Sequence, residues 1–212
     1  MSNNKNFSSN VNYSNDITQT FLGQVACYIS NIFSPPLVVI YGILISAYYI
    51  DTSSRWAWAT LFIMLFVLPP TLYVVSLLKK GQIKDFHMNV RNERVKPLLV
   101  MLINTLVGVG IFYALGTPKF FIVFTLCCLI SVLLMLFVTL SWKISGHGLA
   151  AGGLCVILIT TMHEAAIPFT VIVPIIAWSR VKLSHHTVLQ TVAGVILGFL
   201  TFGIPLYLTG LI

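Results

Sequence analysis

The side chains that could do chemistry in this chain lie in three short polar segments. They are residues 79–97 (KKGQIKDFHMNVRNERVKP), 141–148 (SWKISGHG) and 179–190 (SRVKLSHHTVLQ). A histidine exchanges protons near neutral pH, and its neutral form offers a nucleophilic nitrogen. Lysine and arginine bind anionic groups such as phosphate. Together the segments predict a site that binds a phosphate group, although a basic loop alone would also suit contact with lipid headgroups.

The elements that position these segments are hydrophobic. Of 212 residues, 58% are hydrophobic and only 8% are charged, with a mean hydropathy of +0.95. A soluble domain carries about a quarter charged residues, so the composition predicts a membrane protein. The apolar runs do not alternate with polar residues as barrel strands do. The fold class expected is therefore all-α, a polytopic transmembrane bundle of six to seven helices. The apolar runs are Phe33–Ile50, Trp56–Leu78, Leu98–Leu115, Phe120–Leu140, Leu149–Met162, Ala165–Trp178 and Thr191–Ile212.

The number of apolar runs between the three polar segments predicts that these segments lie close together. Two apolar runs separate the first segment from the second, and two more separate the second from the third. All three segments therefore emerge on one face of the membrane. Ten of the 12 basic residues fall on this face, which the positive-inside rule makes cytoplasmic. We expect a multi-pass protein of the cell inner membrane.

The N-terminal part is less apolar. Residues 1–16 are rich in Asn and Ser, which predicts a disordered tail. Residues 17–32 place apolar side chains at spacings of three and four, as in a helix that lies in the membrane interface. Residues 33–212 are then a single membrane domain. The four cysteines show no metal-binding spacing.

The second and third segments carry the most specific pattern. Ser145, Gly146 and His147 stand where the fifth apolar run begins, so backbone N–H groups there would point toward a bound anion. Arg180 lies six residues before His186, and Gln190 lies one helical turn after it.

These residues resemble the type-2 phosphatidic acid phosphatase superfamily, the membrane lipid-phosphate phosphatases related to vanadium haloperoxidases. The family signature is Lys, six residues, Arg-Pro; Pro-Ser-Gly-His; and Ser-Arg, five residues, His, three residues, Asp. Here Lys84 stands seven residues before Arg91, Ser145-Gly146-His147 is intact, and Ser179-Arg180 precedes His186 by five residues. The resemblance covers roughly residues 79–200.

The resemblance implies a covalent mechanism without a metal or other cofactor. His186 would attack phosphorus and form a phosphohistidine, and His147 would protonate the departing lipid oxygen. The phosphate would be held by five residues: Lys84, Arg91, Ser145, Gly146 and Arg180. Arg94 competes with Arg91 for this role. The implied substrate is a membrane lipid phosphate, either phosphatidate-like or an isoprenyl diphosphate, and no nucleic acid is an expected partner.

Three positions depart from the family pattern. Asn92 and Ile144 replace prolines, which affects the stiffness of the loops. Gln190 replaces the Asp that orients the nucleophilic histidine. Glutamine can accept a hydrogen bond from the imidazole through its amide oxygen, but it brings no charge and can also present its NH₂ group. Asp85 is the nearby carboxylate that could compensate.

Two other functions stay open at this stage. A catalytically weak or silent relative would bind a lipid phosphate or act as a membrane partner protein, and Gln190 supports this reading. A prenyl-transferring enzyme is disfavoured, because such enzymes hold magnesium with Asp clusters and this chain has five acidic residues in total. The sequence leaves the oligomeric state open. Lipid phosphatases of the superfamily often work on the outer side, so the side of the site also stays open.

Overall fold

The structure is a computed structural model that describes residues 20–88 and 90–212. These residues form helices and no strand, which confirms the all-α bundle. The predicted tail, residues 1–16, lies outside them. The α-helices are α2 (Phe21–Ile32), α3 (Pro35–Tyr49), α4 (Arg55–Phe62), α5 (Leu68–Lys79), α6 (Val95–Ala114), α7 (Lys119–Ser141), α8 (Gly146–Met162), α9 (Ile172–Lys182) and α10 (Val188–Leu208). A π-helical turn, Ile63–Val67, joins α4 to α5, and 3₁₀ segments precede α6 (Arg91–Arg94) and α9 (His163–Val171).

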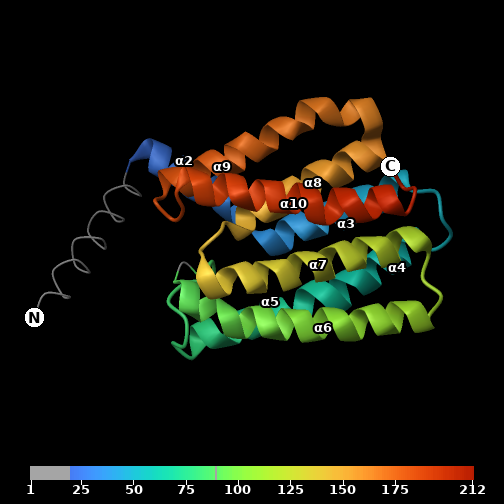
Figure 1. Cartoon of the computed structure of the whole chain (residues 1–212), viewed down its shortest axis with the longest axis horizontal. Helices are drawn as coiled ribbons and strands as arrows, with labels where there is room; N and C mark the ends of the chain where they lie inside the picture. The colour runs from blue at the N-terminus through green and yellow to red at the C-terminus, as the bar shows by residue number, and fades with distance from the viewer. Residues whose placement is uncertain (1–19, 89) are drawn as a thin grey trace, which may run out of the picture.

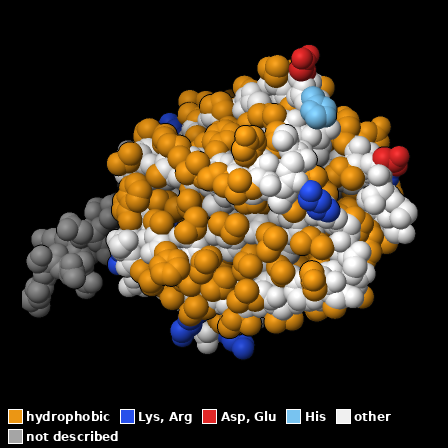
Figure 2. Space-filling model, turned by 45° about the vertical axis from the view of Figure 1, so that its right-hand side comes forward, with side chains coloured by type: hydrophobic (Ala, Val, Ile, Leu, Met, Phe, Trp, Pro, Cys, Tyr) orange, Lys and Arg blue, Asp and Glu red, His pale blue; other side chains and the backbone are white. Residues whose placement is uncertain are grey.

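The helices have the length and composition of membrane spans. Within the described residues, five helical stretches are long and apolar enough to cross a bilayer, or six if α2 and α3, which meet at a 55° bend, count as one broken span. Apolar side chains cover most of the face shown in Figure 2, and few charged side chains interrupt them. Because lipid tails are the solvent for such a face, an exposed apolar surface is expected here.

The fifth and sixth apolar runs form a hairpin. The stretch from Gly146 to Lys182 is continuously helical, but His163 has a positive φ of 52°, which breaks the α-helix. Figure 1 shows α9 returning above α8 after this break. With 17 residues, α8 is about 26 Å long at 1.5 Å per residue, close to the thickness of a hydrocarbon core.

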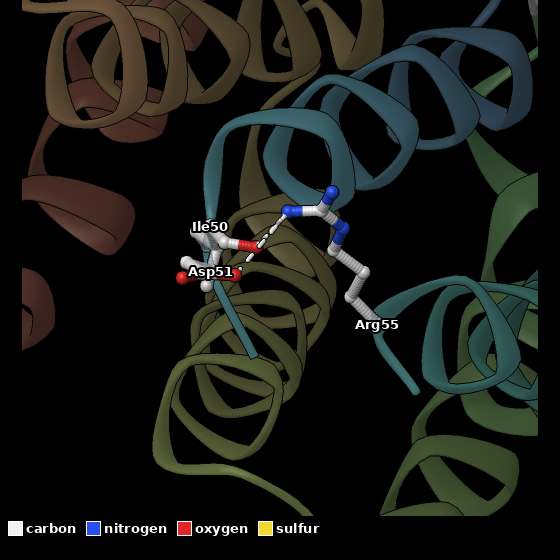
Figure 3. Close-up of polar contacts among 3 residues, drawn as sticks. All are labelled: Ile50, Asp51 and Arg55. Atoms are coloured by element: carbon white, nitrogen blue, oxygen red, sulfur yellow. Dashed lines mark hydrogen bonds and ion pairs between the residues drawn. The ribbon is translucent and has the colours of Figure 1, made fainter. Parts of the chain in front are cut away.

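At one end of the bundle, local polar contacts close the turn between α3 and α4. An Nη atom of Arg55 donates to the carbonyl of Ile50 at 3.1 Å and lies 3.8 Å from an Asp51 carboxylate oxygen (Figure 3). The Asp51 side chain is fully exposed, so this ion pair contributes little to stability.

The three polar segments lie together at the opposite end, as the sequence predicts (Figure 1). The first reaches the second through Arg94, whose Nη1 donates to the Ile144 carbonyl at 2.9 Å. The second reaches the third through Lys143, whose Nζ donates to the His185 carbonyl at 2.7 Å. Buried and half-buried hydrogen bonds therefore join segments that are 50 and 42 residues apart in sequence.

Glycines let α8 and α10 approach closely and so set the spacing of the site. A Cβ built on Gly152 would lie 2.3 Å from the Val195 carbonyl oxygen, and one built on Gly198 would lie 2.1 Å from the Leu149 carbonyl oxygen. Gly148 and Gly194 repeat this contact one turn nearer the site. Small residues at such positions are the usual means of close helix packing in membranes.

Replacing Gly198 with valine is expected to destabilise the protein by about 3 kcal/mol or more, because the new side chain meets backbone atoms that cannot move aside. Gly203 is the matched control on the same helix, since a Cβ there meets nothing within 4 Å. Thermal unfolding of both valine variants measures the effect. Equal midpoints for the two variants would contradict the close approach.

Candidate functional site

The two predicted catalytic histidines line one cavity from different elements. His147 lies in the first turn of α8, and His186 lies in the loop between α9 and α10. Both side chains are buried, with 4% and 6% of their surface exposed. Two arginines, Arg94 and Arg180, line the same cavity and are also buried. The structure thus brings both imidazoles and two guanidinium groups to the wall of a single cavity.

The beginning of α10 determines which nitrogen of His186 carries the hydrogen. Gln190 and Thr187 form a capping box, in which the Thr187 N–H donates to Gln190 Oε1 at 3.2 Å. His186 Nδ1 lies 3.3 Å from the same oxygen. Because the Thr187 N–H can only donate, the Gln190 amide presents its oxygen and not its NH₂ group to both partners. Nδ1 of His186 therefore carries the hydrogen, and Nε2 keeps its lone pair.

The surroundings of His186 keep its imidazole neutral. Burial, first, and then the charges of Arg94, Lys143 and Arg180 lower the pKa of His186 from 6.5 to about 2, while the hydrogen bond to Gln190 raises it. An Nη atom of Arg94 lies 3.4 Å from Nε2. The group is thus a neutral imidazole at physiological pH, with its unprotonated nitrogen beside a cation.

The structure brings Arg94, and not Arg91, to the cavity. Arg94 is 5% exposed, and besides His186 it binds the carbonyls of Met88 and Ile144 at 2.7 and 2.9 Å. Arg91 is exposed and donates to the Ser141 carbonyl at 2.7 Å. Lys84 is exposed as well, and neither Lys84 nor Arg91 lines the cavity. Of the two arginines that the sequence leaves as competitors, the cavity contains Arg94.

A third histidine, which the sequence leaves as either a supporting residue of the site or a solvated one, lies beside His147. The rings of His87 and His147 are 5.0 Å apart in an edge-to-face arrangement, and His87 lines the same cavity. Burial, and secondly Arg180, lower the pKa of His87 to about 4, while Asp85 raises it. His87 stands seven residues before Arg94, the same spacing as that of Lys84 and Arg91. That repeated spacing is the sequence signal that could have identified it.

Ser30, at the end of α2, is the second residue that the sequence does not reveal. Its backbone carbonyl lies 3.1 Å and its Oγ lies 3.4 Å from His147 Nε2. The same Oγ accepts a hydrogen bond from Arg180. Because a carbonyl can only accept, Nε2 of His147 carries a hydrogen. No local signal points to Ser30, since it lies more than 110 residues from His147.

The N-terminus of α8 differs in one detail from the expectation. Ser145 is the N-cap, and its Oγ accepts from the Gly148 N–H at 3.1 Å. The Ser145 N–H donates to the Gln190 carbonyl at 3.1 Å, so this amide is already engaged. Gly146 lines the cavity. Ser145 therefore caps α8 and holds its first turn against α10.

In the described part of the chain, no group of three or more His, Cys, Asp or Glu side chains is placed to hold a metal ion. The cationic residues instead gather around a space that suits an anion. Burial, and then Arg94 and Arg180, also lower the pKa of Lys143, while the charge of Asp85 raises it. Asp85 thus acts electrostatically on the same cluster.

Comparisons with protein-family models, with curated proteins and with solved structures found no match to this chain.

Proposed function

We propose that this protein is an integral-membrane lipid phosphatase that works through a phosphohistidine, as the resemblance to the type-2 phosphatidic acid phosphatases implies. The observation that carries the proposal is the placement of His186. Its Nε2 keeps a lone pair, lies beside Arg94, and belongs to a side chain that lines an apolar cavity. A neutral imidazole next to a guanidinium group is the arrangement that a nucleophile needs toward a bound phosphate.

In the first step, Nε2 of His186 attacks the phosphorus atom. The bond from phosphorus to the lipid oxygen breaks, its electron pair stays on that oxygen, and protonated His147 donates a proton to it. Since Nε2 of His147 already donates to the Ser30 carbonyl, the transferred proton is carried on Nδ1, and His147 would take it from the hydroxyl group of a singly protonated lipid phosphate. In the second step, water attacks phosphorus while His147 takes a proton, and the P–N electron pair returns to His186. The products are the lipid alcohol and phosphate.

Four groups would stabilise the phosphate oxygens as charge develops on them. Arg94 and Arg180 supply two fixed positive charges, and the first turn of α8 supplies backbone N–H groups. Neutral His87 would add a hydrogen bond beside His147. Lys84 and Arg91, at the rim, would act on an approaching anion through longer-range attraction.

Phosphate release tests the function directly. The purified protein is incubated with phosphatidate and with isoprenyl diphosphates, and inorganic phosphate is measured. We expect release from at least one of these lipids. With ³²P-labelled lipid and an alkaline quench, we also expect a transient protein-bound label that is lost on treatment with acid. Absence of release from every lipid would refute the proposal.

A second candidate function is binding without turnover, which Gln190 favours because it brings no charge to His186. Vanadate, a phosphate analogue, would then bind tightly to a protein that releases no phosphate. For either function, the count of basic residues favours the cytoplasmic face for the site.

Replacing Gln190 with aspartate is expected to raise the rate of phosphate release about tenfold. A charge-assisted hydrogen bond to the imidazole is stronger than a neutral one by roughly 1 kcal/mol, which is close to a factor of ten in rate. Glutamate at this position is the control for side-chain length. It adds the charge, and because it is as long as glutamine it can still bond to the Thr187 N–H in the capping box. Unchanged or lower rates in both variants would show that the site is tuned around a neutral partner.

A further inference from the structure

We infer that the cavity behind the histidines binds a single hydrocarbon chain of about ten to thirteen carbons, which makes a single-chain alkyl or isoprenyl phosphate the preferred ligand. This inference rests on the proposed function for the identity of the headgroup. The part of the cavity that would hold the hydrocarbon chain, here called the tail site, is inferred from the shape and chemistry of the cavity alone.

The cavity is polar at one end and apolar along its depth. His147, His186 and Arg94 line its polar end, and from there its lining follows α6 and α8 into the bundle. Its lining residues run from Arg94 to Thr105 on α6 and from Gly146 to Ile157 on α8. Eleven steps of one residue along each of these stretches correspond to about 16 Å at 1.5 Å per residue.

The length and the volume of the cavity both correspond to one hydrocarbon chain. Three backbone bonds of an extended polypeptide span at most about 3.6 Å, so about 16 Å holds roughly thirteen bonds of an extended chain. The cavity volume is about 240 Å³. An apolar cavity of about 150 Å³ holds one benzene molecule, so by proportion this cavity holds on the order of ten carbons. Two acyl chains of ordinary length do not fit in that space.

Away from the histidines and arginines, the walls offer a polar ligand no free hydroxyl hydrogen. Three hydroxyl groups line the cavity, and each already donates a hydrogen bond within the bundle. Thr71 donates to the Val67 carbonyl, Thr105 donates to the Met101 carbonyl, and Ser131 donates to Thr201 Oγ1, each at 2.7 Å. A chain without polar groups is therefore the complementary occupant.

Phenylalanines close the deep end. Phe62 contacts Phe124 edge to face with ring centres 5.2 Å apart, and Phe124 contacts Phe202 in the same way at 5.7 Å. All three rings line the cavity and are buried. Because packed aromatic rings leave no passage, they act as a floor that limits chain length.

The inference is tested with protein in phosphatidylcholine nanodiscs, so that no detergent chain competes for the cavity. The probes are dodecyl phosphate, octadecyl phosphate and dilauroyl phosphatidate at equal mole fraction in the bilayer. Binding is read from the thermal unfolding midpoint, and phosphate release is measured separately. Dodecyl phosphate is expected to bind at least tenfold more tightly than dilauroyl phosphatidate and several-fold more tightly than octadecyl phosphate.

Two variants change the cavity in opposite directions. A Cβ on Gly42, which lines the cavity, would lie 3.5 Å from a ring carbon of Phe124, an ordinary contact, so Gly42→Val fits and shortens the space. We expect it to shift the preference to octyl phosphate, which is added as a further probe for the variants. Phe124→Ala removes part of the floor and should shift the preference toward octadecyl phosphate. Gly110→Val is the control, because Gly110 is exposed on α6 and a Cβ there meets nothing within 4 Å.

The outcomes separate the tail site from the catalytic function. Selective binding of dodecyl phosphate without phosphate release would support the tail site and refute the phosphatase. Phosphate release from all three lipids at similar rates, with similar binding, would support the phosphatase and overturn the tail site. Chain preferences that stay unchanged in both Gly42→Val and Phe124→Ala would also overturn it.

Discussion

Alanine in place of His186 is expected to reduce phosphate release by at least about three orders of magnitude, because no other group in the cavity offers an equally placed nucleophile. The Nε2 atom that attacks phosphorus in the proposed mechanism lies 3.4 Å from Arg94 and belongs to a neutral ring. The residual rate of the His186→Ala variant would come from direct attack by water on a phosphate that the arginines still stabilise. The measurement is the initial rate of phosphate release on the best lipid substrate.

His185→Ala is the matched control for this prediction. His185 is the neighbouring histidine, its side chain does not line the cavity, and its contact with Lys143 uses only its backbone carbonyl. The His185 variant should keep its rate within about threefold of the unmodified protein, as for a residue outside the catalytic groups. Comparable losses in the two variants would mean that neither imidazole is the nucleophile.

Glutamine in place of Arg94 is expected to lower phosphate release by about 10²–10³, the usual effect of removing one group that stabilises a developing negative charge. The same change at Arg91 should have a small effect. Arg91 is exposed and reaches the Ser141 carbonyl, whereas Arg94 is buried and contacts His186. Rates and thermal unfolding midpoints are measured for both variants.

The unfolding midpoints are needed because Arg94 also holds the loop. Its hydrogen bonds to the carbonyls of Met88 and Ile144 join the first two polar segments, so some loss of stability accompanies the loss of rate. Arg94→Lys separates the two effects, since lysine keeps the charge but cannot make the same set of directed bonds. A large loss of rate in the Arg91 variant and a small one in the Arg94 variants would assign the phosphate contact to Arg91.

Much of the architecture follows from local properties of the sequence. Apolar runs long enough to cross a bilayer must become helices, because only a helix satisfies its own backbone hydrogen bonds in lipid. Because two apolar runs separate each polar segment from the next, all three segments must lie at the same end of the bundle. The contacts of Arg94 and Lys143 confirm this placement.

Other features depend on contacts between distant parts of the chain. The loop before α6 has no regular period, so the sequence does not determine whether the pair Lys84 and Arg91 or the pair His87 and Arg94 turns inward. Ser30 reaches His147 from α2 across more than a hundred residues. The orientation of the Gln190 amide depends on the capping box with Thr187.

The sequence by itself determined the membrane bundle, the common end of the polar segments and the presence of His147 and His186 at that end. Hydrophobicity, the number of apolar runs and residue spacing are properties of the linear chain. The tertiary structure alone decided which arginine enters the site, which nitrogen of His186 stays unprotonated, and how deep the apolar cavity is. The physical reason is that these three properties arise from the packing of side chains brought together by folding, and no local pattern encodes them.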